Sequence, residues 1–385
     1  MSFIFRHNLM ALLISFLLVG CSICEDGPQE PQEPTSQKVE LGVRVAVTDG
    51  AAFLGMQSRG PLADAVSDDE KMQTLRIIIV RPDGTVEHNR YYDFHQAPTT
   101  YFTTEKFKVE GGEQKKIYLF ANENTTFTTG HKVADYDFGA IKVGKPFPTD
   151  EVTGQDIETS LIEVNDALTQ IATPLFMSEA HEVAMPKADH DVELIIVRAA
   201  VKFTFMLKNE SSENLPLEEL TISKLARREY LLPKNVVYGS EISEEDSKTE
   251  VQYIKSYDVP MVGNNEHYNF KLSLTDQYPQ LNANTTLTLD PIYLLESNYD
   301  DQPGVEGRNY KISLTLNGET YENGFFDNLE ALPRNTHVVV DVKLNTELKE
   351  LNCSVRVYPY GEYWLNPGFR NRCDARNASG SLLYP

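Results

Sequence analysis

The fold is decided by one stretch near the start of the chain, Val39-Glu-Leu-Gly-Val-Arg-Val-Ala-Val-Thr48, in which apolar residues alternate with polar or small ones without a break. Alternation with a period of two places the apolar side chains on one face of an extended strand. That face consists of Val39, Leu41, Val43, Val45 and Val47. The stretch therefore predicts a β-strand with one buried face, and an all-β fold if the same pattern recurs.

The pattern does recur along the chain. Leu75–Val80 leads into the turn sequence Arg81-Pro-Asp-Gly84, which is typical of a hairpin, and Tyr310–Leu316 alternates as far as the turn dipeptide Asn317-Gly318. Further strands are expected over 116–121, 195–207, 338–344 and 353–357, whereas the best helical pattern, over 150–171, is weak. Many short strands separated by turns predict an all-β chain of two antiparallel sandwiches in tandem.

The N-terminal residues have the form of a lipoprotein signal. Met10–Gly20 is apolar, follows Arg6, and is too short to span a bilayer comfortably, which favours a signal peptide over a transmembrane helix. It runs into Cys21 through Leu18-Val19-Gly20, the pattern that a bacterial lipoprotein peptidase recognises, so Cys21 is the predicted site of lipid attachment. Cys21 and Cys24 also form a C-x-x-C pair, but no second such pair lies nearby to complete a zinc or redox site.

Composition along the chain suggests its division into parts. Residues 25–38 are rich in Pro and Glu and too polar to fold, while Pro174, Pro186 and mixed charge mark a boundary before the strong pattern at 195. The expected parts are a signal peptide over 1–20, a disordered tether over 21–38, an N-terminal sandwich over 39–190 and a C-terminal sandwich over 191–385.

The charge of the chain argues against several kinds of partner. Its 385 residues include 57 acidic and 35 basic ones, for a net charge of −22. Such a surface repels nucleic acid and anionic lipid, so neither is an expected partner. Past residue 21 no apolar run approaches the length of a membrane span, so membrane attachment is expected through lipid alone.

Catalytic and metal-binding motifs are missing from the sequence. No G-x-S-x-G, H-E-x-x-H, Walker loop, G-x-G-x-x-G or EF-hand loop occurs, so no enzyme activity, cofactor or metal is predicted. Asp189-His190-Asp191 is the one cluster of acids with a histidine, and a solvated loop explains it better than a cation site. Cys353 and Cys373 form either a disulfide or two buried thiols, and the sequence leaves both open.

Taken in order, these pieces resemble the fimbrillins, or type V pilins, of Bacteroidota. The resemblance begins with the lipoprotein signal at Cys21, the acidic tether, the strand over 39–47 and Arg59. It continues through Ile117-Tyr-Leu-Phe-Ala-Asn-Glu-Asn124, Pro174–Met177, Val197-Arg-Ala-Ala-Val-Lys-Phe203, Leu332-Pro-Arg-Asn335 and Val355-Arg-Val-Tyr-Pro-Tyr360. Nothing in residues 372–385 takes part in it.

The resemblance implies sandwiches of transthyretin-like shape and a route of assembly. A lipoprotein precursor carrying palmitate on Cys21 reaches the outer membrane and cell surface, where an Arg-type protease cuts between Arg59 and Gly60. The cut removes the lipid together with the strand over 39–47, and a terminal strand from another fimbrial subunit fills the groove. The resulting fimbrium adheres to a ligand on a host or bacterial surface.

Three alternatives remain at this point. An uncleaved outer-membrane anchor or accessory fimbrial lipoprotein would keep the strand over 39–47 in place. A glycan-binding surface lipoprotein would need an exposed row of aromatic side chains. An enzyme has no positive support in the sequence. The sequence also leaves open whether the subunit lies at the tip, shaft or base, and whether Val355–Leu365 or the terminal tail donates a strand.

Overall fold

A computed structural model describes residues 37–48, 67–149, 156–243, 246–262, 267–298, 310–325, 329, 331–345 and 350–359. Within these ranges β-strands are the dominant secondary structure, joined by turns and irregular segments, with two short 3-10 turns, η2 (Asp68–Glu70) and η3 (Phe138–Ala140), and no α-helix. The predicted all-β sandwich fold is therefore confirmed. The weak helix expected over 150–171 is wrong for the described part of that range, which holds a strand, β7 (Leu161–Glu163). No helix in the described ranges is long and apolar enough to cross a membrane.

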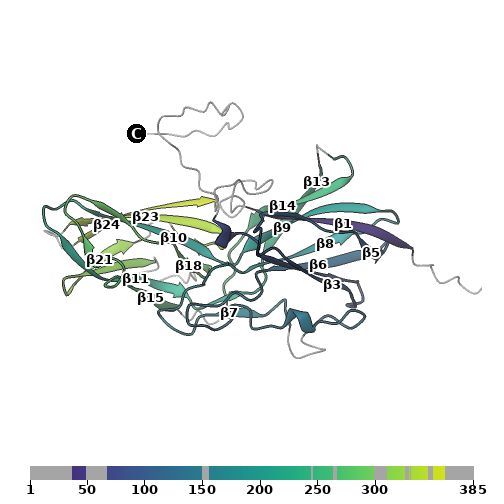
Figure 1. Cartoon of the computed structure of the whole chain (residues 1–385), viewed down its shortest axis with the longest axis horizontal. Helices are drawn as coiled ribbons and strands as arrows, with labels where there is room; N and C mark the ends of the chain where they lie inside the picture. The colour runs from purple at the N-terminus through teal and green to yellow at the C-terminus, as the bar shows by residue number, and fades with distance from the viewer. Residues whose placement is uncertain are drawn as a thin grey trace, which may run out of the picture. The chain divides into compact units, whose positions relative to one another are not determined.

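The first sheet has two layers that continue into one another. One layer has the order β3 (Val86–Asp93), β2 (Thr74–Val80), β6 (Gln114–Ala121) and β8 (Met177–Ala184). The other contains β1 (Lys38–Val47), β4 (Tyr101–Thr103), β5 (Phe107–Glu110), β9 (His190–Arg198), β14 (Thr249–Tyr257) and β13 (Val236–Ile242). The layers join where the start of β8 pairs with the end of β9, and Figure 1 shows the strands of both layers as one group.

The second sheet is built in the same way. Its first layer has the order β15 (His267–Ser273), β11 (Leu215–Ala226), β20 (Lys311–Leu316) and β21 (Glu319–Phe325). Its second layer has the order β24 (Glu350–Pro359), β23 (Thr336–Asn345), β10 (Val201–Asn209) and β17 (Thr286–Thr288). The short strands β16 (Gln280–Leu281) and β18 (Ile292–Leu294) add to β11 and β10. Two small ladders pair β7 with β12 (Arg228–Tyr230) and β19 (Ser297–Asn298) with β22 (Ala331–Leu332).

One expected strand is in fact two. The alternation over 195–207 predicts a single strand, but β9 ends at Arg198 and β10 begins at Val201, and the two belong to different sheets. The passage between them, Ala199–Ala200, is small and fully buried. Alternation alone does not reveal the break, because both faces of β9 are buried. Leu194 and Ile196 lie in the core of the first sandwich, and Ile195 and Val197 lie in a smaller cluster with Ile254. A boundary at 190/191 would separate β9 from the sheet to which it is hydrogen-bonded.

The predicted hairpins are present. β2 pairs with β3 through the turn at Gly84, and β20 pairs with β21 through Asn317 and Gly318, whose φ angles are 49° and 74°. Two successive positive φ values define the tight hairpin turn that Asn-Gly favours, because both residues tolerate the left-handed region. The strands expected over 116–121, 338–344 and 353–357 correspond to β6, β23 and β24.

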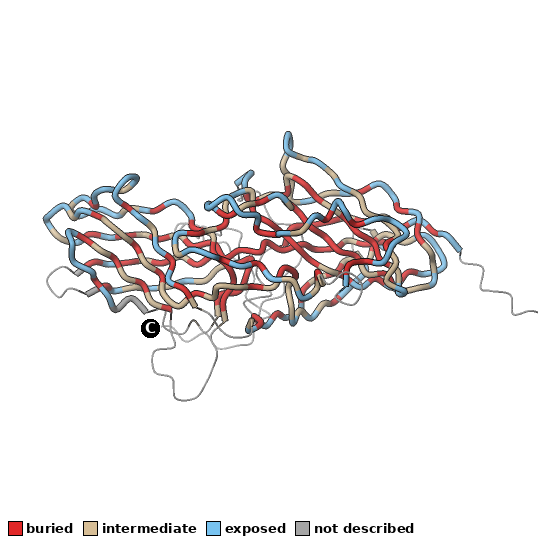
Figure 2. Tube along the Cα trace, turned by 90° about the horizontal axis from the view of Figure 1, so that it is seen from below, coloured by how far each residue is buried: buried red, intermediate tan, exposed pale blue. Residues whose placement is uncertain are grey.

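The first sandwich has its core between its two layers. This core consists of buried side chains from β1, β2, β5, β6, β8 and β9. Figure 2 shows buried positions along the interior of the chain trace and exposed positions at its outer loops. The outer face of β2 and β6 is buried as well, because the segment between β6 and β8 crosses it. Tyr118 stacks on Phe147 at 4.2 Å between ring centroids, and Phe120 stacks on Phe138 at 4.0 Å.

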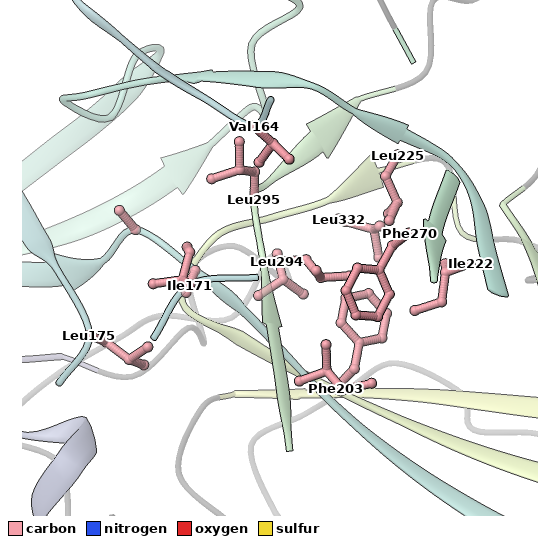
Figure 3. Packing of buried hydrophobic residues seen from close by; sticks show 14 of the residues in the cluster. Val164, Ile171, Leu175, Phe203, Ile222, Leu225, Phe270, Leu294, Leu295 and Leu332 are labelled. Atoms are coloured by element: carbon pink, nitrogen blue, oxygen red, sulfur yellow. The ribbon is translucent and has the colours of Figure 1, made fainter. Parts of the chain in front are cut away.

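The core of the second sandwich is continuous with that covering segment. Figure 3 shows part of this core, in which the labelled side chains of Phe203, Ile222, Phe270 and Leu294 lie close together, with Leu225 and Leu332 beside them. Val164, Ile171 and Leu175, which precede β8, belong to the same buried cluster. The hydrophobic core therefore extends from the second sandwich onto the outer face of the first.

Candidate functional site

The candidate site is the position of β1 in the first sheet, which we call the β1 slot. β1 pairs in parallel with β9 from Leu41–His190 to Val47–Ile196. On its other edge it pairs antiparallel with β5 at 38–41 and with β4 at 44–46. β1 is therefore an interior strand, and its removal would expose unpaired N–H and C=O groups on three strands, β9 on one side and β4 and β5 on the other.

The apolar face of β1 forms part of the core. The five predicted residues are buried, Val39 with 3% exposure and Leu41, Val43, Val45 and Val47 with none. Burying a side chain of this size stabilises a fold by about 1.5–3 kcal/mol, so the face contributes roughly 7–15 kcal/mol before losses in chain entropy are counted.

Two side chains fix the position of β1 along the slot. Thr104, which lies between β4 and β5, donates from Oγ1 to the Val43 carbonyl at 2.9 Å and accepts from the Val43 N–H at 3.3 Å. Asp189 Oδ1 accepts the Glu40 N–H at 2.9 Å. A slip of one residue would break these bonds and turn the apolar side chains outward.

The outward face of β1 meets acidic side chains. Arg44 Nη2 lies 3.1 Å from Asp246 Oδ2, and Arg44 stands opposite Glu193 in the pairing with β9. Glu193 accepts a hydrogen bond of 2.9 Å from the Tyr101 hydroxyl. The Asp191 carboxylate lies over Gly42, where an added Cβ would come within 2.1 Å of Asp191 Oδ1.

The end of β1 is held by the second sandwich. Asn335, which precedes β23, donates from Nδ2 to the Thr48 carbonyl at 3.1 Å. The Asn335 Oδ1 accepts from Arg198 Nη1 at 3.1 Å, and Arg198 Nε donates to the Glu70 carbonyl at 2.9 Å. Arg198, Asn335 and Thr48 are all buried. These hydrogen bonds connect the exit of β1 with the entry to β2.

The Glu70 carboxylate anchors the other side of this junction. It lies 2.9 Å from Lys202 Nζ and accepts from the Tyr293 hydroxyl at 2.8 Å and the Ser67 N–H at 3.2 Å. Burial alone would raise the pKa of the Glu70 carboxyl, but the charge and hydrogen bond of Lys202 outweigh burial and hold that pKa below its ordinary value. Residues 48 and 67, which flank the segment 49–66, are therefore both fixed at the junction.

The predicted site residues fall into two groups. The five apolar residues predicted over 39–47 lie on the buried face of β1, and the removal of this strand stays a prediction. The other predicted site residues lie outside the described ranges. Lipid attachment at Cys21, cleavage between Arg59 and Gly60 and a disulfide to Cys373 therefore stay predictions. Cys353 lies on β24, and burial raises the pKa of its thiol to about 11.

The acid–histidine cluster does not form a metal site. Asp189 and Asp191 contact β1 as described above, and His190 Nε2 lies 3.3 Å from Glu250 Oε2. Within the described ranges, no group of three or more His, Cys, Asp or Glu side chains is arranged to hold a metal ion. The loop prediction is correct for Asp189, which lies exposed between β8 and β9, and wrong for His190 and Asp191, which begin β9.

The residues that position β1 are not evident from the sequence. Arg198 and Asn335 stand within stretches that carry the family resemblance, but nothing local indicates that they meet. Asn335 has a φ of 58°, a left-handed conformation that Asn tolerates better than most residues. An Asn after Pro-Arg and before a strand is therefore the one sequence signal that could have pointed to this position.

A second buried polar cluster lies beside the junction. Arg334 Nη2 is 2.6 Å from Glu296 Oε1 and 3.8 Å from Glu229 Oε1, and all three side chains are buried. Burial raises the pKa of Glu229. Nearby, Glu179 accepts a hydrogen bond from the Tyr238 hydroxyl, and burial raises the pKa of Glu179 to about 8. These groups link β8, β12 and β13 and show no access for a substrate.

An open groove of about 740 Å³ crosses β6, β8 and the β13–β14 hairpin. Charged and amide side chains dominate its lining, among them Lys116, Glu182, Gln252 and Lys255. In the described ranges the aromatic side chains with more than a third of their area exposed are Tyr91 and Tyr101, and neither lines this groove. The groove thus offers no row of exposed rings for stacking on sugars.

Comparison of the sequence with protein-family models and with curated proteins finds no match. Solved structures to which this chain is similar include a candidate cell adhesion protein from Parabacteroides distasonis, with a TM-score of 0.49 and 12% identity over 84% of this chain and 98% of that one. The tip fimbrial protein Mfa3 from Porphyromonas gingivalis, solved with a C-terminal truncation, has a TM-score of 0.45 and 12% identity over 84% and 99% of the two chains.

A fimbrilin, FimA, from Porphyromonas gingivalis is similar to the same degree, with a TM-score of 0.45 and 12% identity over 84% of this chain and 98% of that one. All three identities are 12% and all three TM-scores are below 0.5, so the proposed function rests on the contacts of β1 and not on these similarities.

Proposed function

We propose that the chain is a structural and adhesive subunit of a surface fimbria, exported as a lipoprotein precursor and assembled by strand exchange after cleavage between Arg59 and Gly60. The observation that carries this proposal is the attachment of β1. It is an interior strand of the first sheet, yet its only covalent link to the rest of the sandwich runs through the segment 49–66. A single cut there would separate β1, with the lipid on Cys21, from an otherwise continuous chain.

The space left by β1 determines what replaces it. Two strand edges and five apolar pockets can be satisfied together only by another extended strand with the same alternation. Such a strand, supplied by another subunit, restores the ladders on both edges of the slot. Other subunits of the fimbria are the proposed partners, and the cell surface is the proposed location.

An uncleaved anchor or accessory lipoprotein is the second candidate. In this role β1 would stay in place, and a filled slot accepts no strand and ends a fibre. The glycan-binding alternative lacks support in the described ranges, where no row of exposed aromatic side chains is present. The proposed role is structural and requires no catalytic group or cofactor.

N-terminal sequencing of the protein recovered from the cell surface tests the proposal. We expect the mature chain to begin at Gly60 and to run on gels as a ladder of polymers. Arg59→Ala should leave the lipid-bearing precursor as a monomer, whereas Arg81→Ala, at a turn in the first sandwich, should leave cleavage unchanged. A mature N-terminus at Cys21 in the unmodified protein would contradict the subunit role and support the anchor.

A further inference from the structure

We propose that the outer face of the β1 slot selects the strand that fills it, by requiring a cation at the position of Arg44 and no side chain at the position of Gly42. This inference rests on the proposed strand exchange and adds to it the chemistry of the incoming strand. The buried pockets specify only apolar alternation, which many strands of this chain possess. Selection among such strands must therefore come from the outward positions.

The cation requirement follows from the charges around Arg44. Asp246 Oδ2 lies 3.1 Å from its guanidinium, Glu193 stands opposite it on β9, and Asp191 is two residues earlier on the same face of β9. Three carboxylates thus face one arginine. The side chains of Arg44 and Asp246 are 28% and 38% exposed, so water and salt screen their interaction less than that of a fully exposed pair. An acid in place of Arg44 would add a fourth negative charge to this group.

The glycine requirement depends on the same carboxylates. A Cβ at position 42 would lie 2.1 Å from Asp191 Oδ1 and 3.1 Å from Asp191 Cγ. Any side chain there forces Asp191 to turn away from the strand. Because Asp191 contributes to the electrostatic environment that raises the pKa of Arg44, its displacement also weakens the preference for a cation. The preference for a cation at position 44 therefore depends on the absence of a side chain at position 42.

The remaining outward positions discriminate less. Glu40 Oε2 lies 3.4 Å from Lys106 Nζ, but these side chains are 54% and 52% exposed, and exposed pairs contribute little. Ala46 is 1% exposed, which favours a small residue there. On its outward face, the slot therefore favours a strand with no side chain at position 42, a cation at position 44 and a small residue at position 46.

The chain contains a natural counterexample in β23. Val338, Val340, Val342 and Leu344 alternate as well as the apolar face of β1 does. When Val340 and Val342 are aligned with Val43 and Val45, Asp341 takes the place of Arg44 and Val339 the place of Gly42. The apolar pockets could accept this sequence. Its outward residues do not fit, because Asp341 would place an acid at position 44 and Val339 would place a side chain at position 42.

Peptide exchange into the full-length chain tests this inference. A recognition site for a site-specific protease, placed within 49–66, allows β1 to be cut free without relying on Arg59. The cut protein is then incubated with a fluorescent peptide spanning Lys38–Thr48, and anisotropy and gel filtration measure incorporation. Matched peptides carry Arg44→Lys, Arg44→Glu, Gly42→Val or Val43→Asp, and a further peptide spans Thr336–Leu344.

We expect the unsubstituted and Arg44→Lys peptides to enter, and the Arg44→Glu, Gly42→Val and Thr336–Leu344 peptides to enter about tenfold less. In the protein, Asp246→Arg should restore entry of the Arg44→Glu peptide, and Asp246→Asn should weaken the preference without reversing it. Equal entry of the Arg44→Glu, Gly42→Val and unsubstituted peptides would overturn the selectivity alone. Failure of every peptide, the unsubstituted one included, would overturn strand exchange and the selectivity with it.

Discussion

The side-chain amide of Asn335 donates a hydrogen bond of 3.1 Å to the main-chain carbonyl of Thr48, so the second sandwich holds the last residue of the β1 segment. The same amide accepts from Arg198, whose guanidinium also binds the Glu70 carbonyl. One asparagine therefore connects the end of β1, the passage between the sheets and the entry to β2.

Replacing Asn335 should destabilise the fold. Asn335→Gly preserves the positive φ but leaves the buried Thr48 carbonyl and the Arg198 guanidinium each without one bond, which costs about 1–3 kcal/mol. Asn335→Ala should cost about 1 kcal/mol more, because alanine is strained at a positive φ. Chemical denaturation followed by circular dichroism measures both, and a glycine variant as stable as the parent would exclude a structural role for the amide.

Truncation of the apolar face of β1 should be more costly. Leu41→Ala removes a fully buried side chain from the core of the first sandwich, and such changes lower the free energy of unfolding by about 2–5 kcal/mol. Glu40→Ala, at the next residue on the exposed face, is the matched control and should change it by less than about 0.5 kcal/mol. Equal effects of the two variants would contradict the assignment of the buried face.

The raised pKa of Glu179 should make the free energy of unfolding depend on pH. Burial raises its pKa to about 8 from an ordinary value of 4.5, so between these values the folded chain holds a proton that the unfolded chain has released. The resulting stabilisation is complete below pH 4.5 and is lost as the pH rises through about 8. Urea midpoints measured from pH 6 to 9 should fall in the parent. Glu179→Gln, which still accepts from Tyr238, should flatten the profile, and an unchanged slope in this variant would rule Glu179 out.

His181 should produce a dependence of the opposite sign. Burial lowers its pKa to about 4 from 6.5, and its Nε2 lies 2.7 Å from the Ile195 carbonyl. The neutral ring therefore contributes stability that is present above pH 6.5 and is lost as the pH falls through about 4. His181→Gln should remove this acid-side loss in urea titrations from pH 7 to 4. An acid-side loss that persists unchanged in His181→Gln would exclude His181 as its source.

The sequence predicts those features that local spacing determines. The alternation over 39–48 identifies β1 and its buried face because a strand with one apolar side repeats every second residue. The Asn317-Gly318 hairpin is equally local, since two positive φ values are needed at adjacent positions. These features depend on neighbours within a few residues and need no knowledge of the rest of the chain.

The contacts that position β1 are not local, and sequence spacing gives no hint of them. Thr104 meets Val43 across 61 residues, Asp189 meets Glu40 across 149, and Asn335 meets Thr48 across 287. The incorrect prediction of a helix over 150–171 has a related cause. Ile162, Val164 and Ile171 are buried in the covering segment without forming a helix, because an irregular segment that crosses a sheet also turns apolar residues to one side.

The mixed pairing of β1, parallel to β9 and antiparallel to β4 and β5, has a consequence for the shape of any polymer. A strand that replaces β1 can reproduce both ladders only if it enters in the same direction along the slot. Every joint in the proposed fibre would then be head-to-tail, which is a heterologous contact that generates an open filament rather than a closed dimer. Such a filament has two different ends, and one of them always presents an empty slot until a subunit that keeps its own β1 arrives.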